Sequence, residues 1–182
     1  MKNLRLLVLS SLLVTVAACS SRAPEPAAVP LASWADPRVE NLTTIAEAQG
    51  YEVEREGEEI RLIIPVNGNF HPKRTLLLPK GLVPLSKVAQ AIRDDSESQF
   101  TVVGHSDSAG DDELNEKLSL ERAQAVANVL MLGGVSRQRL HLSTMGENAP
   151  RADNSTETGR DLNRRVEIVL TPYPATSVAM AQ

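Results

Sequence analysis

The spacing of apolar residues constrains the fold of this chain more than any other feature. The longest stretch with a helical repeat covers residues 114–132 and is followed by two glycines that end it. A second helical face covers residues 82–92. Short apolar runs predict strands at 100–104, 139–143 and 165–170. Strands that alternate with amphipathic helices predict an α+β fold, a two-layer sandwich with a mixed sheet and the helices on one face.

The segment before this β-α-β-α-β core adds a helix and a β-hairpin. A helical repeat over residues 37–49 follows Asp36, a candidate N-cap. The two strands of the predicted hairpin are residues 51–55 and 60–64. Either Pro79 or Pro84 lies near the start of the second helix. The sequence leaves open which of the two it is, because proline is tolerated only in the first turn.

The first nineteen residues have the pattern of an export signal. A basic start precedes a mainly apolar run over residues 6–16, which is shorter than the roughly 20 residues that span a bilayer. The run ends in Val16-Ala17-Ala18-Cys19, which resembles the lipobox of bacterial lipoproteins. In that family the signal is cut before the cysteine, so the resemblance implies lipidation of Cys19. The resemblance also implies sorting to the outer membrane, because Ser20 and not aspartate follows the cysteine.

These features divide the chain into five parts. They are a signal peptide (1–18), a lipidated cysteine with a Pro/Ala/Ser tether (19–33), a lead-in of helix and hairpin strand (34–59), the main domain (60–170) and a flexible tail (171–182). The 19 Lys and Arg against 23 Asp and Glu give a net charge of −4, which argues against a nucleic-acid partner.

Two groups of motifs lie in the second half of the chain. The first runs Gly104-His-Ser-Asp107-Ser-Ala-Gly110 and continues as Asn115-Glu-Lys-Leu118-Ser-Leu-Glu-Arg122-Ala. The second ends in Asn163-Arg164-Arg165-Val166-Glu167. In order and spacing over residues 60–170 they resemble the OmpA-like peptidoglycan-binding domain. With the lipobox, the layout resembles that of the peptidoglycan-associated lipoproteins.

The resemblance implies an outer-membrane lipoprotein whose domain faces the periplasm and binds peptidoglycan without a cofactor. The implied ligand is the diaminopimelate of the stem peptide, held non-covalently, so that the protein tethers the outer membrane to the wall. Asp107 matches the family's acid and would accept hydrogen bonds from the ligand's ammonium. Arg122 matches the family's arginine, whose planar fork suits a carboxylate.

Further residues are implied at the same site. Leu118 and Asn115 precede Arg122 by one and two helical turns, so they share its face of the helix. Ser106 keeps the hydroxyl of the threonine that is usual in the family. Arg164 matches a position at the edge of the site, where a ligand contact and a structural role remain open.

One stretch departs from the family's pattern. Phe70-His71-Pro72-Lys73 stands where the family commonly continues Phe-Asp. His71 and Lys73 reverse the local charge, so the effect of these two residues on that side of the pocket stays open.

The residues do not support catalysis or a metal site. His105, Ser106 and Asp107 supply the residue types of a triad, but neighbours in a strand point to opposite faces and cannot form a relay. One cysteine and three histidines give no metal cluster. Two functions therefore remain: a passive wall anchor, or a regulatory or assembly lipoprotein whose lead-in region binds a periplasmic protein partner.

Overall fold

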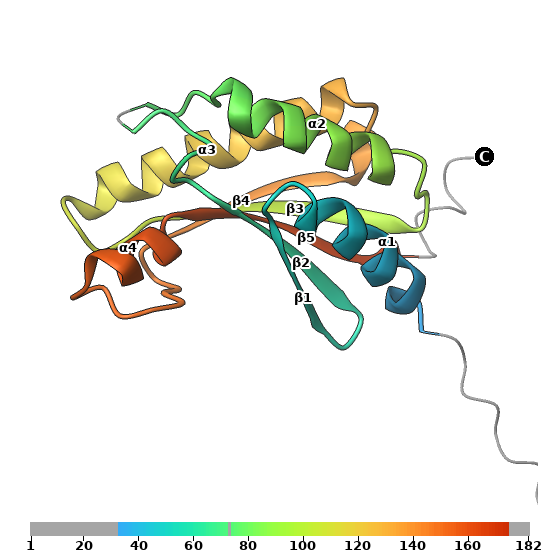
Figure 1. Cartoon of the computed structure of the whole chain (residues 1–182), viewed down its shortest axis with the longest axis horizontal. Coiled ribbons are helices and arrows are strands. Elements are labelled where there is room, and N and C mark those ends of the chain that lie inside the picture. Colours follow the sequence, from blue (N-terminus) through green and yellow to red (C-terminus); the bar gives the residue numbers. More distant parts are fainter. Residues whose placement is uncertain (1–32, 73, 175–182) are drawn as a thin grey trace, which may run out of the picture. The chain divides into compact units, whose positions relative to one another are not determined.

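Helices and strands follow one another in the order that the apolar pattern predicts (Figure 1). The computed structural model describes residues 33–72 and 74–174. The strands are β1 (Glu52–Glu56), β2 (Glu59–Pro65), β3 (Ser98–His105), β4 (Leu140–Gly146) and β5 (Arg165–Pro172). The helices are α1 (Ala35–Glu47), α2 (Pro79–Ile92), α3 (Asp112–Leu132) and α4 (Glu157–Asn163), and a 3-10 turn, Arg137–Arg139, precedes β4.

The five strands form one mixed sheet in the order β1-β2-β5-β3-β4. The pair β3 and β4, joined by α3, is parallel, and the other neighbouring pairs are antiparallel. Strand β5 lies in the centre, where Ile168 pairs with Leu62 of β2 on one side and with Val102 of β3 on the other. The predicted mixed sheet is confirmed.

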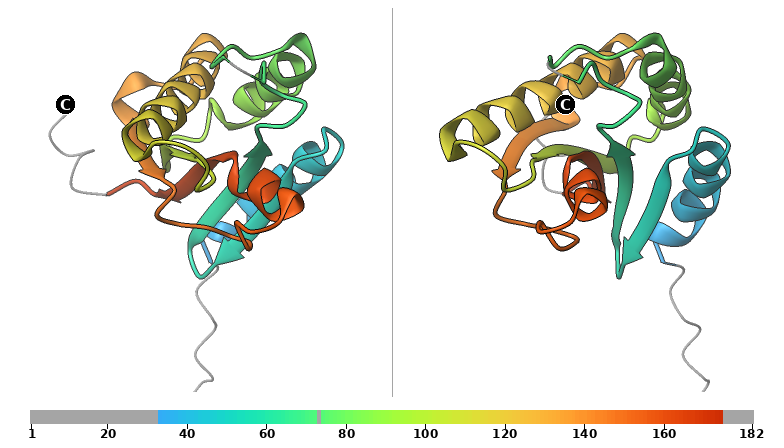
Figure 2. Two further views of the ribbon diagram at one scale, coloured as in Figure 1. Left: turned by 90° about the vertical axis from the view of Figure 1, so that its left-hand side faces the viewer. Right: turned by 60° about the vertical axis from the view of Figure 1, so that its left-hand side comes forward.

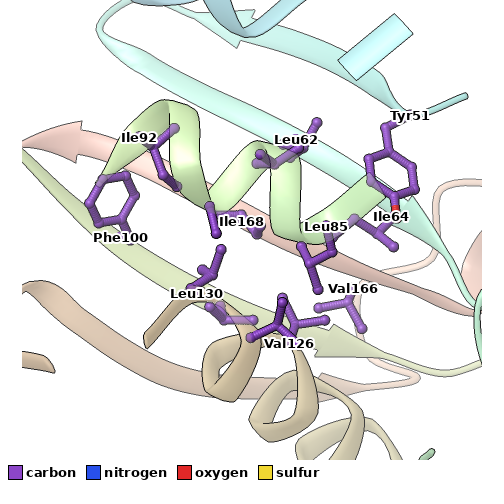
Figure 3. Close-up of a cluster of buried hydrophobic side chains, with 14 of the residues drawn as sticks. Tyr51, Leu62, Ile64, Leu85, Ile92, Phe100, Val126, Leu130, Val166 and Ile168 are labelled. Atoms are coloured by element: carbon purple, nitrogen blue, oxygen red, sulfur yellow. The ribbon is translucent and has the colours of Figure 1, made fainter. Parts of the chain in front are cut away.

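Helices α1, α2 and α3 pack over one face of the sheet (Figure 2). Alternate residues of β2, β3 and β5 point toward these helices, because side chains of a strand alternate between its two faces. Figure 3 shows part of the resulting core, which includes Leu62, Ile64, Leu85, Phe100, Val126, Leu130 and Ile168. The two-layer α+β sandwich is therefore confirmed, with a single core between sheet and helices.

Helix α1 begins earlier than predicted and is capped in another way. It starts at Ala35 and not at Pro37, and no side chain of the N-cap residue caps it. The N–H of Ala35 instead donates to Glu58 Oε2 at 2.9 Å, from the turn between β1 and β2. Asp36, the predicted N-cap, lies in the first turn and pairs with Arg55. A carboxylate from the hairpin thus takes the role predicted for the local one.

The segment 34–59 is continuous with the rest of the fold. Strand β1 pairs with β2 along its length, and Leu42 and Ala46 of α1 lie in the common core. The described residues on both sides of position 60 belong to one compact unit. The last strand extends to Pro172, two residues into the predicted tail, because Thr171 and Pro172 still pair with Gln99 and Ser98 at the start of β3.

Helix α2 resolves the question about its two prolines. Pro79 is the first residue of the helix, where the missing N–H costs nothing. Pro84 lies further inside, where it removes one backbone hydrogen bond.

The predicted signal peptide (1–18), Cys19, nearly all of the tether and residues 175–182 lie outside the described residues. Within the described part, none of the helices is both long enough and apolar enough to cross a membrane.

Candidate functional site

The six predicted site residues come from three places at one end of the sheet. Ser106 and Asp107 follow directly after β3, and Arg164 lies between α4 and β5. The remaining three, Asn115, Leu118 and Arg122, lie on α3. The loop between β3 and α3 turns at Gly110, whose φ of 101° is unfavourable for other residues, and ends at Asp111, which caps α3 by accepting from Leu114 N.

A close approach of α3 to β3 fixes where the helix places its polar residues. A Cβ atom added at Gly104 of β3 would lie 2.0 Å from the carbonyl oxygen of Ser119 on α3. Only a glycine allows the helix to lie this near the strand. As a result Asn115, Ser119 and Arg122 are buried although they are polar.

Asp107 is buried, and both of its carboxylate oxygens have partners. Oδ1 accepts from the N–H of Ala109 at 3.1 Å, and Oδ2 accepts from Nη1 of Arg164. The cation paired with Asp107 is therefore Arg164, whose Nη2 also donates to Asp161 Oδ1. Burial tends to lower the pKa of Arg164, but these hydrogen bonds outweigh it and raise the pKa, so the guanidinium stays charged.

Arg122 is a buried cation to which no carboxylate of the described residues is bonded. Only 6% of the residue is exposed, and its Nε has no hydrogen-bond partner among the described residues. Burial and, next, the charge of Arg164 lower the pKa of Arg122, while Asp107 acts in the opposite direction. An unsatisfied buried donor costs free energy, and a bound carboxylate would satisfy it.

Asn115 and Ser106 are as buried as Asp107 and Arg122. Nδ2 of Asn115 donates to the carbonyl oxygens of Asp107 and Ala109, each at 3.2 Å, and to Glu147 Oε2 at 3.1 Å. It therefore braces the loop that carries Asp107. The N–H of Ser106 donates to Gly146 O at 2.7 Å, and its buried Oγ has no partner among the described residues.

A cavity of about 590 Å³ lies beside these charges. Both Arg122 and Arg164 line it. The other lining residues are Val66, Asn67, Gly68, Phe70, Pro72, Leu78, Glu157 and Asp161. Two arginines, two acids and an apolar wall suit a small ligand that carries both signs of charge on an aliphatic chain.

The structure brings only part of the predicted set to this cavity. Arg122 and Arg164 line it, and Asp107 is bonded to Arg164 but is not part of the lining. Leu118 lines a different hollow, together with Arg74, Thr75, Leu76 and Glu121. Sequence reasoning missed Glu157 and Asp161, whose spacing of four residues on a helix is the signal that could have found them.

The stretch that departs from the family's pattern, residues 70–73, contributes two apolar residues to the cavity. Phe70 and Pro72 line the cavity, and His71 between them does not. Lys73 lies outside the described residues.

The opposite face of the sheet carries a separate charge cluster, formed by His105, Arg165 and Glu167. Arg165 Nε donates to Glu167 Oε1 at 2.7 Å, and His105 Nε2 lies 3.6 Å from the same oxygen. No hydrogen bond joins His105 to Ser106 or Asp107 in the described structure, so these three do not form a relay. Nor do the described residues contain a group of three or more His, Cys, Asp or Glu that could hold a metal ion.

The structure is thus an α+β sandwich with a paired acid, two arginines and a cavity at one end of the sheet. The chain belongs to the OmpA family, whose model matches residues 69–164.

Two relatives and one solved structure illustrate this membership. The probable lipoprotein YiaD of Escherichia coli is 38% identical over 123 residues, which are 68% of this chain and 56% of YiaD. The outer-membrane lipoprotein YfiB of Pseudomonas aeruginosa is 31% identical over 164 residues, 90% of each chain. The cell wall anchor of the T6SS from Pseudomonas aeruginosa superposes with a TM-score of 0.65 at 29% identity, over 74% of this chain and 96% of the anchor. None of these names describes an enzyme.

Proposed function

We propose that this chain is an outer-membrane lipoprotein that binds peptidoglycan non-covalently through the diaminopimelate of the stem peptide and so tethers the outer membrane to the wall. Membership of the OmpA family supports the proposal, as do relatives named as lipoproteins and as a cell wall anchor. The role is one of binding, without a catalytic step.

The single observation that carries the proposal is Arg122. It is a buried guanidinium that faces a cavity, and its Nε lacks a partner among the described residues. Diaminopimelate offers carboxylates that can bond such a fork in parallel. It also offers an ammonium, for which Asp107 is the nearby buried acid, and an aliphatic chain that matches the apolar wall of Phe70 and Leu78.

The membrane attachment rests on the sequence. Cys19 would carry the acyl chains, and more than one chain is needed for stable anchoring. Residues 20–33 would then form the tether between the lipid and the domain, about 45 Å if fully extended.

Sedimentation with purified sacculi tests the proposal. A lipid-free protein of residues 20–182 should co-sediment, and free meso-diaminopimelate should compete. Asp107→Asn and Arg122→Gln should each weaken binding about tenfold or more, because each removes a charge-assisted hydrogen bond from a buried group. Arg137→Gln is the matched control, since Arg137 is an exposed arginine that does not line the cavity.

Two outcomes would count against the proposal. Binding that neither substitution weakens would contradict the site. Failure to bind sacculi, together with capture of one defined periplasmic protein by residues 20–182 that substitutions on the surface of segment 34–59 abolish, would favour the regulatory alternative.

A further inference from the structure

The acid proposed to receive the ligand's ammonium is already occupied. Arg164 donates one N–H group to Asp107 and another to Asp161. Asp161 lies three residues before Arg164 on α4, whereas Asp107 lies 57 residues away in sequence, after β3. Arg164 therefore bridges two carboxylates, one from each side, at the place where a ligand cation would meet Asp107.

We infer that Arg164 is an internal counter-ion that fills the ammonium position of the free protein, and that Asp161 is the positioning residue that holds Arg164 when the ligand displaces it. The inference rests on the proposed function, and it assigns a role to a residue, Asp161, that the motif pattern does not single out.

The burial of Asp107 explains why its carboxylate needs a cation beside it in the free protein. The side chain of Asp107 is only 9% exposed, and an unpaired buried carboxylate is costly. Arg164 donates to Oδ2 of Asp107 and the N–H of Ala109 donates to Oδ1, so a ligand ammonium that approaches this carboxylate meets the guanidinium of Arg164. The two cations also repel each other, which makes binding an exchange of one cation for another.

Asp161 lowers the cost of that exchange. Once the ammonium takes Asp107, Arg164 keeps one carboxylate partner and its charge stays balanced. The second oxygen of Asp161 lies 3.4 Å from Nδ2 of Asn67, which holds the acid on the cavity wall. A balanced Arg164 also repels Arg122 less, which matters because both arginines line the cavity and the charge of Arg164 lowers the pKa of Arg122.

A double-mutant cycle tests the inference. The ligand is a soluble stem peptide that ends in meso-diaminopimelate, and calorimetry measures its affinity for the protein of residues 20–182. Asp161→Asn should weaken binding about fivefold, the upper range for a partly exposed ion pair. Arg164→Gln should strengthen binding, because Asp107 loses its competitor. In the Arg164→Gln background, Asp161→Asn should have no further effect.

Two controls separate this role from a structural one. Glu157→Gln removes the same charge from the same cavity, one turn away on α4, but Glu157 is not bonded to Arg164, so affinity should stay within about twofold. A peptide acetylated on its free diaminopimelate amine does not compete for Asp107. Its affinity should be insensitive to Asp161→Asn.

Three results would overturn the inference. Asp161→Asn could lower the affinity equally with and without Arg164, or equally for the free and the acetylated peptide. Arg164→Gln could bind the peptide more weakly than the unaltered protein. If Arg164→Gln fails to fold, Arg164→Lys replaces it. One ammonium cannot bridge both acids, so it holds Asp107 less firmly and can still move to Asp161, and the variant should bind at least as tightly as the unaltered protein. The proposed function fails separately, when the unaltered protein binds neither peptide or when Arg122→Gln has no effect.

Discussion

Glu167 lies on the face of the sheet opposite helices α1, α2 and α3. It should make the free energy of unfolding depend on pH in the acid range. Its side chain is 5% exposed and accepts a hydrogen bond from Arg165. Burial raises the pKa of Glu167, but the neighbouring His105 and Arg165 outweigh it and lower the pKa from 4.5 to about 2. Each pKa unit corresponds to about 1.4 kcal/mol, so the ionised carboxylate contributes about 3 kcal/mol to the free energy of unfolding.

The sign follows from the lowered pKa. Since the folded protein releases this proton more readily than the unfolded chain, the contribution is complete above about pH 5 and is lost as the pH falls from 4.5 toward 2. Glu167→Gln should therefore be about 3 kcal/mol less stable than the unaltered protein at pH 7, and the difference should nearly vanish at pH 2.

Urea unfolding followed by circular dichroism between pH 2 and pH 7 measures this difference. Glu40→Gln, at an exposed position of α1, is the control and should leave the unfolding free energy within about 0.5 kcal/mol of its original value at every pH. A difference for Glu167→Gln that stays constant from pH 7 to pH 2 would refute the reasoning, because it would mean that packing and not charge is lost.

Two further predictions concern the support of the cavity. Gly104→Ala should lower the free energy of unfolding by about 2 kcal/mol or more, because the added Cβ would collide with Ser119 O. An unchanged midpoint of urea unfolding would contradict the tight contact of β3 and α3. Asn163→Ala should lower the free energy of unfolding by about 2 kcal/mol and speed amide exchange at Arg151 and Ala152. The N–H groups of these two residues donate to Oδ1 of the fully buried Asn163 at 2.8 and 3.0 Å. Unchanged exchange at both amides would argue that Asn163 does not hold this loop.

The local periodicity of apolar residues predicted most of the helices and strands. The helix predicted over 114–132 forms as Asp112–Leu132, and the predicted strand over 100–104 forms the middle of β3. The buried face of the helix is apolar only in its second half, since Asn115, Ser119 and Arg122 form the buried face of the first half. The start of α1 was wrong for a non-local reason. Its first N–H donates to Ser33 Oγ, two residues before it, and to Glu58, 23 residues away, and the sequence near Ala35 contains no sign of the second contact.

Less of the candidate site could be predicted from the sequence. The buried position of Arg122 follows from the helical face that it shares with Asn115, and the motif spacing identified both. The pairing of Asp107 with Arg164 depends on how α4 brings its last turn against the loop after β3, and no local pattern encodes that distance. The placement of Leu118 beside a separate hollow depends in the same way on the loop around Leu76.

The central position of β5 bears on the order in which this chain can fold. Residues 165–172 fill the gap between β2 and β3, yet they come after both along the chain. Before they are synthesised, both flanking strands expose backbone groups at open edges, the arrangement that favours aggregation. The pairing of Ile60 with Leu170 closes a loop that contains most of the domain, and such distant contacts slow folding. The sheet is thus completed from its middle, and its two halves, β1-β2 and β3-β4, are joined only when the last strand has emerged.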